Sequence, residues 1–235
     1  MIRKLLPLVI LLFGVFNTIS AQRIIIEEKI TEQDSEPLFG PNRKHFIHSF
    51  LNLGFIIGES EGEGSPIIYG RSMSYEFGSR YKRKLSKHLS LGIELSYLRQ
   101  LYHIKQSDDK TFPDESINES QRLAIDNFAL GYYHRFNFGR RGDYVGRFLD
   151  LGVNACWQFS KNVKTKNTIN NLEIETIVSG YDFFEPFVYN AFARIGASIF
   201  VLKGTYRIND IFKSTSAYDE FPRFNIALEI GIHQM

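Results

Sequence analysis

A strict alternation of apolar and polar side chains runs from Arg147 to Phe159. Most even-numbered positions in this segment carry a polar or small side chain, while the odd-numbered positions after Arg147 are apolar. The apolar positions are Leu149, Leu151, Val153, Ala155, Trp157 and Phe159. A period of two residues places these side chains on one side of a β-strand. The segment therefore predicts a strand with one apolar and one polar face.

About eight comparable segments follow one another between residues 44 and 235, separated by polar or glycine-containing connections. The longer connections come after the third and fifth segments, and residues 161–185 form the longest one. This pattern predicts an all-β fold, an eight-stranded antiparallel up-and-down transmembrane β-barrel. Closure is expected because an open sheet edge in lipid leaves backbone groups unpaired.

The amino terminus has the layout of an export signal. Arg3 and Lys4 precede an apolar run that is shorter than the roughly 18 residues of a membrane-spanning helix. We expect a cleaved signal peptide at 1–21, a short periplasmic extension at 22–43 and the barrel at 44–235. A membrane anchor is the less favoured alternative for the leader. The extension's apolar start could add a strand to a partner or pack against the barrel.

Composition excludes several classes of function. The chain has 28 basic and 26 acidic residues with a net charge of +2, which lacks the basic excess of nucleic-acid-binding proteins. The single cysteine, Cys156, excludes an internal disulfide framework and a thiolate zinc cluster. The six histidines are scattered without metal-ligand spacing. We therefore expect no metal and no cofactor.

Alternation also places ten charged side chains on the inner face of the predicted barrel. They are Glu76, Arg80, Glu94, Asp126, Arg135, Asp150, Arg194, Lys203, Arg207 and Glu229. An eight-stranded barrel has an interior only wide enough for its own side chains. These groups are therefore predicted to form an ion-paired core that does not conduct.

Turn positions predict partners within this core. The connection 139–146 places Arg135 opposite Asp150, and we expect an ion pair there. A turn centred on Leu85 places Glu76 opposite Glu94, and two facing carboxylates require a bridging base or a bound proton. A catalytic carboxylate pair is the alternative, which the filled interior disfavours because substrate is excluded.

Two arginines, Arg71 and Arg99, interrupt the outward apolar face. The same turn geometry places them opposite each other near the external rim. They are candidate contacts for the phosphates of lipopolysaccharide, and the alternative is that each simply extends its charge to the membrane surface.

A tight turn is predicted at Gly196–Ala197, since glycine adopts the positive φ that two-residue hairpins require. The chain around the connection after the third predicted strand holds His103, Ser107 and Asp108. A serine, a histidine and an acid of this kind are found at the rim of lipid-modifying barrel enzymes. Such a trio arises by chance in any polar loop. We therefore expect that the protein is not an enzyme.

Several segments carry a resemblance to a known family: the leader end Ser20-Ala21-Gln22, the repeated outward aromatic residues, Ala193–Gly196 and Gly204–Phe212. Over about residues 44–234 the chain resembles the outer-membrane β-barrel family of Bacteroidota, related in architecture to OmpA, OmpX and PorT-like barrels. The resemblance implies an integral outer-membrane protein, and PorT-like members take part in type IX secretion.

These observations predict an exported protein of the Gram-negative outer membrane that contacts lipopolysaccharide and acts as an envelope structural or partner-binding protein. One alternative is an accessory subunit of a secretion or assembly machine, and another is a lipid-modifying enzyme. A soluble lipocalin-like barrel is a further alternative, which requires the aromatic face to turn inward.

Overall fold

A computed structural model describes residues 38–60, 62, 64–139, 142 and 144–232. The predicted signal peptide and most of the predicted extension lie outside the described residues. The described part of the chain belongs to one compact unit, Pro37–Met235. No helix in this part is long and apolar enough to cross a membrane.

The fold is all-β and antiparallel, and its sheet closes into a ring. The strands are β1 (His45–Ile57), β2 (Met73–Lys84), β3 (Leu89–Ile104), β4 (Ser120–Phe138), β5 (Arg147–Ile169), β6 (Leu172–Ser179), β7 (Phe187–Ala197), β8 (Phe200–Arg207) and β9 (Phe224–Ile232). Their order is β4-β3-β2-β1-β9-β8-β7-β5-β6, and β4 also pairs with β5. This last pairing closes the ring, while β6 stands outside it.

β6 corrects the sequence prediction, because the described residues contain nine strands and the segment 161–185 had been expected to be a connection. Its hairpin with β5 turns at Asn170 and Asn171, whose φ angles are 51° and 63°. Two consecutive positive φ angles match the right-handed twist of the flanking strands, and asparagine tolerates them better than most residues. A two-residue turn therefore continues β5 into a long hairpin.

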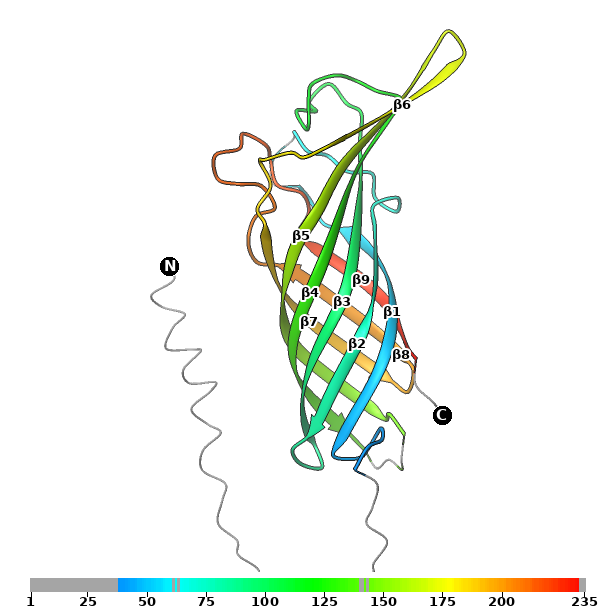
Figure 1. Cartoon of the computed structure of the whole chain (residues 1–235), viewed down its shortest axis with the longest axis vertical. Helices are drawn as coiled ribbons and strands as arrows, with labels where there is room; N and C mark the ends of the chain where they lie inside the picture. Colours follow the sequence, from blue (N-terminus) through cyan, green and yellow to red (C-terminus); the bar gives the residue numbers. More distant parts are fainter. Residues whose placement is uncertain (1–37, 61, 63, 140–141, 143, 233–235) are drawn as a thin grey trace, which may run out of the picture. The chain divides into compact units, whose positions relative to one another are not determined.

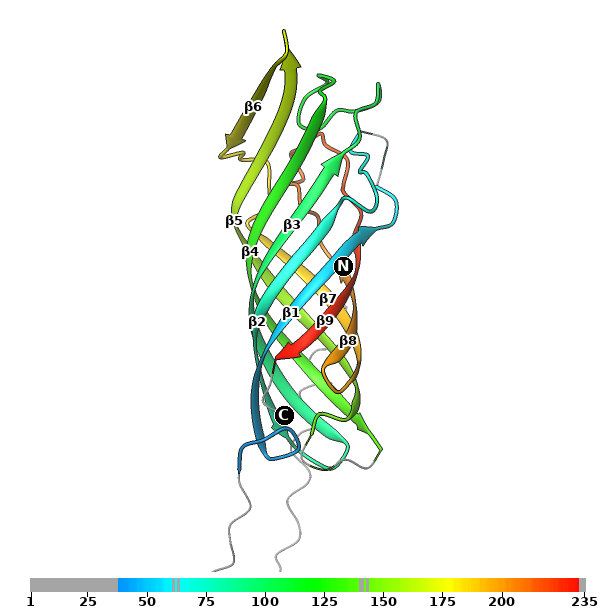
Figure 2. The same cartoon turned by 90° about the vertical axis from the view of Figure 1, so that its right-hand side faces the viewer.

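The connections differ between the two ends of the ring (Figure 1). At the short-turn end, β2–β3, β4–β5 and β7–β8 are joined by tight or moderate turns. The long-loop end carries the connections 58–72, 105–119, 180–186 and 208–223. The β5–β6 hairpin projects from the long-loop end, as the two views of Figures 1 and 2 agree.

Two predicted turns are shifted in the structure. The β7–β8 turn lies at Ser198–Ile199, because Gly196 is an inward strand position at which a Cβ would overlap the ring of Phe148. The β2–β3 turn is displaced toward the carboxyl side of Leu85. There the hydroxyl of Ser86 accepts hydrogen bonds from the amides of His88 and Leu89.

The predicted alternation of faces is confirmed along the strands. Outward side chains such as Leu95, Leu130 and Leu228 are more than half exposed, and they are apolar. Inward side chains such as Asp150 and Arg194 are fully buried, and many of them are charged. The ring thus has its apolar side outside and its ionic side inside.

We predict that the asparagine turn is required for the β5–β6 hairpin. Replacing Asn170 and Asn171 together with alanine costs about 1 kcal/mol per residue, since alanine keeps the Cβ that disfavours positive φ but lacks the side-chain amide that compensates in asparagine. Amide hydrogen exchange in 162–179 should become about thirtyfold faster, because about 1.4 kcal/mol corresponds to a factor of ten, while exchange in the ring strands stays unchanged. The matched control with glycine at both positions should keep the wild-type protection. Equal exchange in the alanine and glycine variants would contradict this account of the turn.

Candidate functional site

The centre of the ring holds a network of buried ion pairs around Glu94 on β3. Its carboxylate lies 3.0 Å from Nε of Arg80 and 2.5 Å from Nη1 of Arg194. Arg80 donates two further hydrogen bonds to Glu229, at 2.8 and 3.0 Å. Arg194 also lies 3.2 Å from Asp150. Four strands besides β3 therefore meet at this network, and none of its charges is left without an opposite charge nearby.

The predicted pair of Arg135 and Asp150 is confirmed. The two residues are direct partners on β4 and β5, and the guanidinium donates to both carboxylate oxygens at 2.7 and 2.8 Å. The guanidinium carbon of Arg135 also lies 3.6 Å from the ring centroid of Phe148. The bidentate ion pair and the aromatic ring together fix the position and orientation of the buried guanidinium.

Two further pairs extend the network toward the long loops. The ammonium of Lys203 lies 2.8 Å from Glu76, which also accepts hydrogen bonds from Asn52 and Ser96. Arg207 lies 2.6 Å from Glu220 in the connection 208–223. Nine of the ten predicted core residues thus form buried ion pairs, and Glu220 is a partner that the strand pattern did not indicate.

The predicted juxtaposition of Glu76 and Glu94 is wrong. Glu94 is the register partner of Arg80, and Glu76 is the partner of Leu98. The displaced β2–β3 turn shifts the pairing so that each carboxylate meets a base instead of the other carboxylate. The alternative of a catalytic carboxylate pair loses its geometric basis.

Asp126 does not belong to the core. It shares the outer face with Phe128, two residues along β4, and its carboxylate accepts a hydrogen bond from the hydroxyl of Tyr97 at 2.5 Å. Arg99 is its register partner on β3 and lies 3.6 Å away as an ion pair. The sequence prediction placed Asp126 on the inner face, although its parity is that of Phe128.

The predicted pairing of Arg71 and Arg99 is also wrong. Arg99 lies opposite Tyr75 on β2 and opposite Asp126 on β4. Arg71 precedes β2 and lies in the connection 58–72. The shifted register separates the two arginines along the strands, so they do not lie opposite each other.

A small polar space lies inside the ring beside these pairs. It has a volume of about 30 Å³ and is lined by amide, hydroxyl and charged groups that include Asn154, Asn190, Glu76 and Lys203. This volume suits about one water molecule. The described interior is therefore filled by side chains at this level.

The long-loop end of the ring is closed by an aromatic plug, which we define as the cluster around the fully buried ring of Phe112. Phe112, in the connection 105–119, contacts aromatic rings from two other connections, with centroid distances of 5.2–6.3 Å. These neighbours are Phe183, Phe184, Phe212, Tyr218 and Phe221. Tyr102 of β3 stacks on Phe221 below them. The loops thus have a packed core of their own.

Glu220 joins the plug to the ionic interior. It accepts hydrogen bonds from the amides of Ile211 and Phe212 and from Arg207. Burial raises the pKa of Glu220, against the opposing effects of Arg207 and the Phe212 amide. The carboxylate of Glu220 therefore holds the backbone of the plug at residues 211–212 and pairs with Arg207 of the interior.

The β5–β6 hairpin is amphipathic. On one face, Lys164 pairs with Glu175 at 2.7 Å and Lys166 with Glu173 at 2.8 Å. The opposite face begins at Val163, which is buried in the core beneath the loops, and continues with exposed apolar side chains. These side chains are Ile169, Leu172, Ile174 and Val178. We call them the hairpin face.

The trio of His103, Ser107 and Asp108 is not assembled. Among the described residues, no hydrogen bond joins the side chain of His103 to Ser107 or Asp108, and the register partner of His103 is Arg122. No group of three or more potential ligands is arranged to hold a metal in this part of the chain. Cys156 is a buried inner position that accepts a hydrogen bond from Asn190.

The plug and the hairpin were both missed from the sequence. Their signals are the paired phenylalanines at 183–184 and the asparagine pair at 170–171. Comparison with known proteins adds no assignment, because no family model and no curated protein matches the chain.

We predict that the paired charges inside the ring are interdependent. Arg135→Met should lower the free energy of unfolding in detergent by about 3 kcal/mol, because it leaves Asp150 with only Arg194 as a counter-ion. The double variant with Asp150→Leu should lose less than the sum of the single variants. Denaturant titration followed by circular dichroism measures both, and strictly additive losses would contradict the interdependence.

Proposed function

We propose that this chain is an integral β-barrel protein of the Gram-negative outer membrane, exported by a cleaved signal peptide. Its interior is filled and does not conduct, and its long-loop end binds a protein partner. One observation carries the membrane part of the proposal, which is the reversal of polarity between the two faces of the closed sheet.

The outer face supports contact with lipid. Aliphatic and aromatic side chains are exposed on every strand of the ring, and their extent far exceeds the apolar patches that water-soluble monomers tolerate. A soluble lipocalin-like barrel requires the opposite arrangement, with these rings inside. The closed sheet pairs its backbone groups internally, as hydrocarbon demands.

Strand length fits a bilayer. On β5 the outward positions run from Arg147 at the short-turn end to Trp157, an interval of about 11 residues, which is the length of a tilted transmembrane strand. Trp157 stacks with Phe128, and Tyr97 contacts Phe128 at the same level. A belt of aromatic rings at one boundary of the apolar band is typical of membrane interfaces.

The filled interior argues against transport through the ring. Ion pairs occupy its centre, the polar space beside them has room for about one water, and the aromatic plug closes the long-loop end. A role must therefore depend on the outer surfaces of the protein and its projecting segments.

The hairpin supports partner binding. Leu172 is 68% exposed and Ile174 46% exposed on a segment that projects past the ring, where the proposal places water. β6 is the last strand in the sheet order, so its outer edge is available for strand addition. We propose that the occupant is a protein that lays an extended segment along β6 and covers the hairpin face. An accessory subunit of a secretion or assembly machine has this property, as does an envelope scaffold.

We predict that lipid, not water, covers the outer face at mid-height. Val153→Arg should destabilise the protein in lipid vesicles by about 2–4 kcal/mol. The control Ile177→Arg, on the projecting hairpin, should leave vesicle insertion and stability unchanged. Folding yield into vesicles and denaturant titration measure the difference. A Val153→Arg protein as stable as wild type would contradict membrane embedding.

We predict that the hairpin face is required for partner binding. After mild extraction from the native envelope, Leu172→Ser with Ile174→Ser should lose at least about a hundredfold of a specific co-purifying protein, since burial of each side chain contributes about 1.5–3 kcal/mol. The control Ile177→Ser changes an equally exposed side chain on the opposite face and should retain that protein. Identical partner profiles for all three proteins would contradict the assignment.

A further inference from the structure

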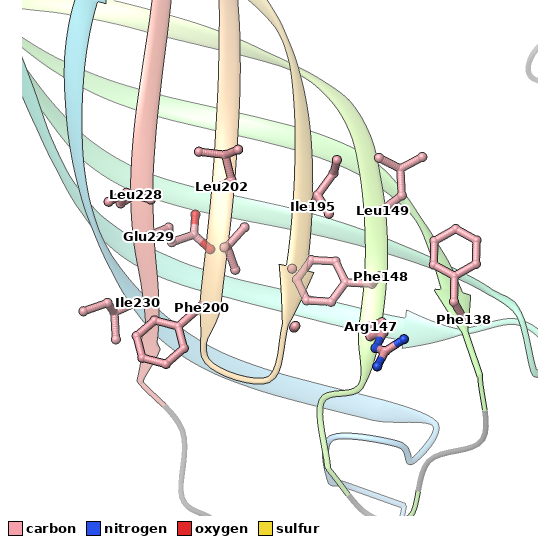
Figure 3. A pocket seen from close by; sticks show the side chains of 13 residues that line it. Phe138, Arg147, Phe148, Leu149, Ile195, Phe200, Leu202, Leu228, Glu229 and Ile230 are labelled. Carbon is pink, nitrogen blue, oxygen red and sulfur yellow. The ribbon is translucent and has the colours of Figure 1, made fainter.

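A groove lies on the outer face of the ring at the short-turn end, across β5, β7, β8 and β9 (Figure 3). Its volume is about 750 Å³. Leu149 and Phe138 stand on one side, and Leu228 and Ile230 stand on the other. The groove is thus an apolar channel on a face that the proposed function places in lipid.

Small residues explain why the face is hollow here. The strand end of β7 contributes Gly196 and Ala197 to the lining, between the larger side chains of the neighbouring strands. Gly196 lets the ring of Phe148 approach from inside, and Ala197 leaves the outer side open. The hollow is therefore built into the strand sequence and does not depend on a loop conformation.

One end of the groove is cationic. Arg147 is exposed, lines the groove and is the register partner of both Phe138 on β4 and Ala197 on β7. Its guanidinium can donate two parallel hydrogen bonds to a phosphate. An apolar channel that ends at an arginine matches a molecule with an acyl chain and a phosphate-bearing headgroup.

The charged residues near the groove indicate which charge the lipid headgroup should carry. The described residues of the turns and of the adjoining strand ends at this end carry several bases. The bases are Arg43, Lys44, Arg83, Lys84, Lys87 and Arg147. Each lysine or arginine near a membrane surface adds attraction for anionic lipid. A net negative headgroup is therefore favoured over a zwitterionic one.

We propose that this groove is a binding site for one anionic phospholipid, with an acyl chain along the apolar walls and the phosphate on Arg147. The inference rests on the proposed function. In that orientation the short-turn end faces the periplasm, where phospholipid forms the leaflet. The site therefore takes a phospholipid of the inner leaflet and is separate from the long-loop end.

Lipid titration of the full mature chain in detergent, read by native mass spectrometry, tests the site. Phosphatidylglycerol should bind at least fivefold more tightly than phosphatidylcholine. Arg147→Gln should abolish this preference, and Ala197→Phe, which fills the groove, should reduce binding of both lipids about tenfold. Arg83→Gln removes a base at the same end outside the groove and should lower this preference much less than Arg147→Gln does.

Three outcomes would overturn the site. They are equal binding of the two lipids to the wild type, unchanged binding by Ala197→Phe, and an equal loss in Arg83→Gln and Arg147→Gln. The last outcome would mean a diffuse attraction to the basic end. Failure of the proposed function is distinguishable, because a chain that stays folded and monodisperse without any detergent contradicts membrane embedding itself. A chain that needs detergent and shows one of the three outcomes contradicts the groove alone.

Discussion

Pairing of charges that have no access to water is the constraint on which the structure depends. Glu94 meets Arg80 of the adjacent strand and Arg194 of β7, which lies across the ring. A buried charge that loses its partner costs about 3–5 kcal/mol, whereas the intact pair adds little net stability. The network therefore contributes chiefly to specificity, because an incorrect strand register would leave buried charges unpaired. A slip of one residue in any of these strands would carry its charges to the apolar face.

The ion pairs inside the ring limit the surfaces on which the proposed functions can depend. Because ion pairs occupy the centre of the ring and the aromatic plug covers its long-loop end, the proposed roles depend on the outer surfaces. The two ends then differ in character. The long-loop end carries an amphipathic hairpin with a free strand edge, and the short-turn end carries several basic residues beside an apolar groove. These surfaces suit a protein and a lipid, respectively.

Sequence reasoning identified the strands of the ring and most of the side chains that face inward, because both follow from an alternation that is local to each strand. It paired Arg135 with Asp150 correctly across one connection. It failed across another, because the hydroxyl of Ser86 accepts amide hydrogen bonds and moves the turn. Sequence reasoning also placed Asp126 on the inner face. Asp126 lies two residues from Phe128 on β4, so the alternation of side chains along that strand is by itself enough to place it on the outer face.

The amino-acid order alone decided the two faces, the all-β class and the balance of buried acids and bases, since a period of two residues needs no knowledge of distant partners. Tertiary structure decided which base meets which acid, because register depends on turn geometry and on closure of the ring. It also decided that loop phenylalanines pack into a plug and that a predicted connection is a projecting hairpin. Both outcomes depend on contacts between segments far apart in the chain, which local periodicity does not encode.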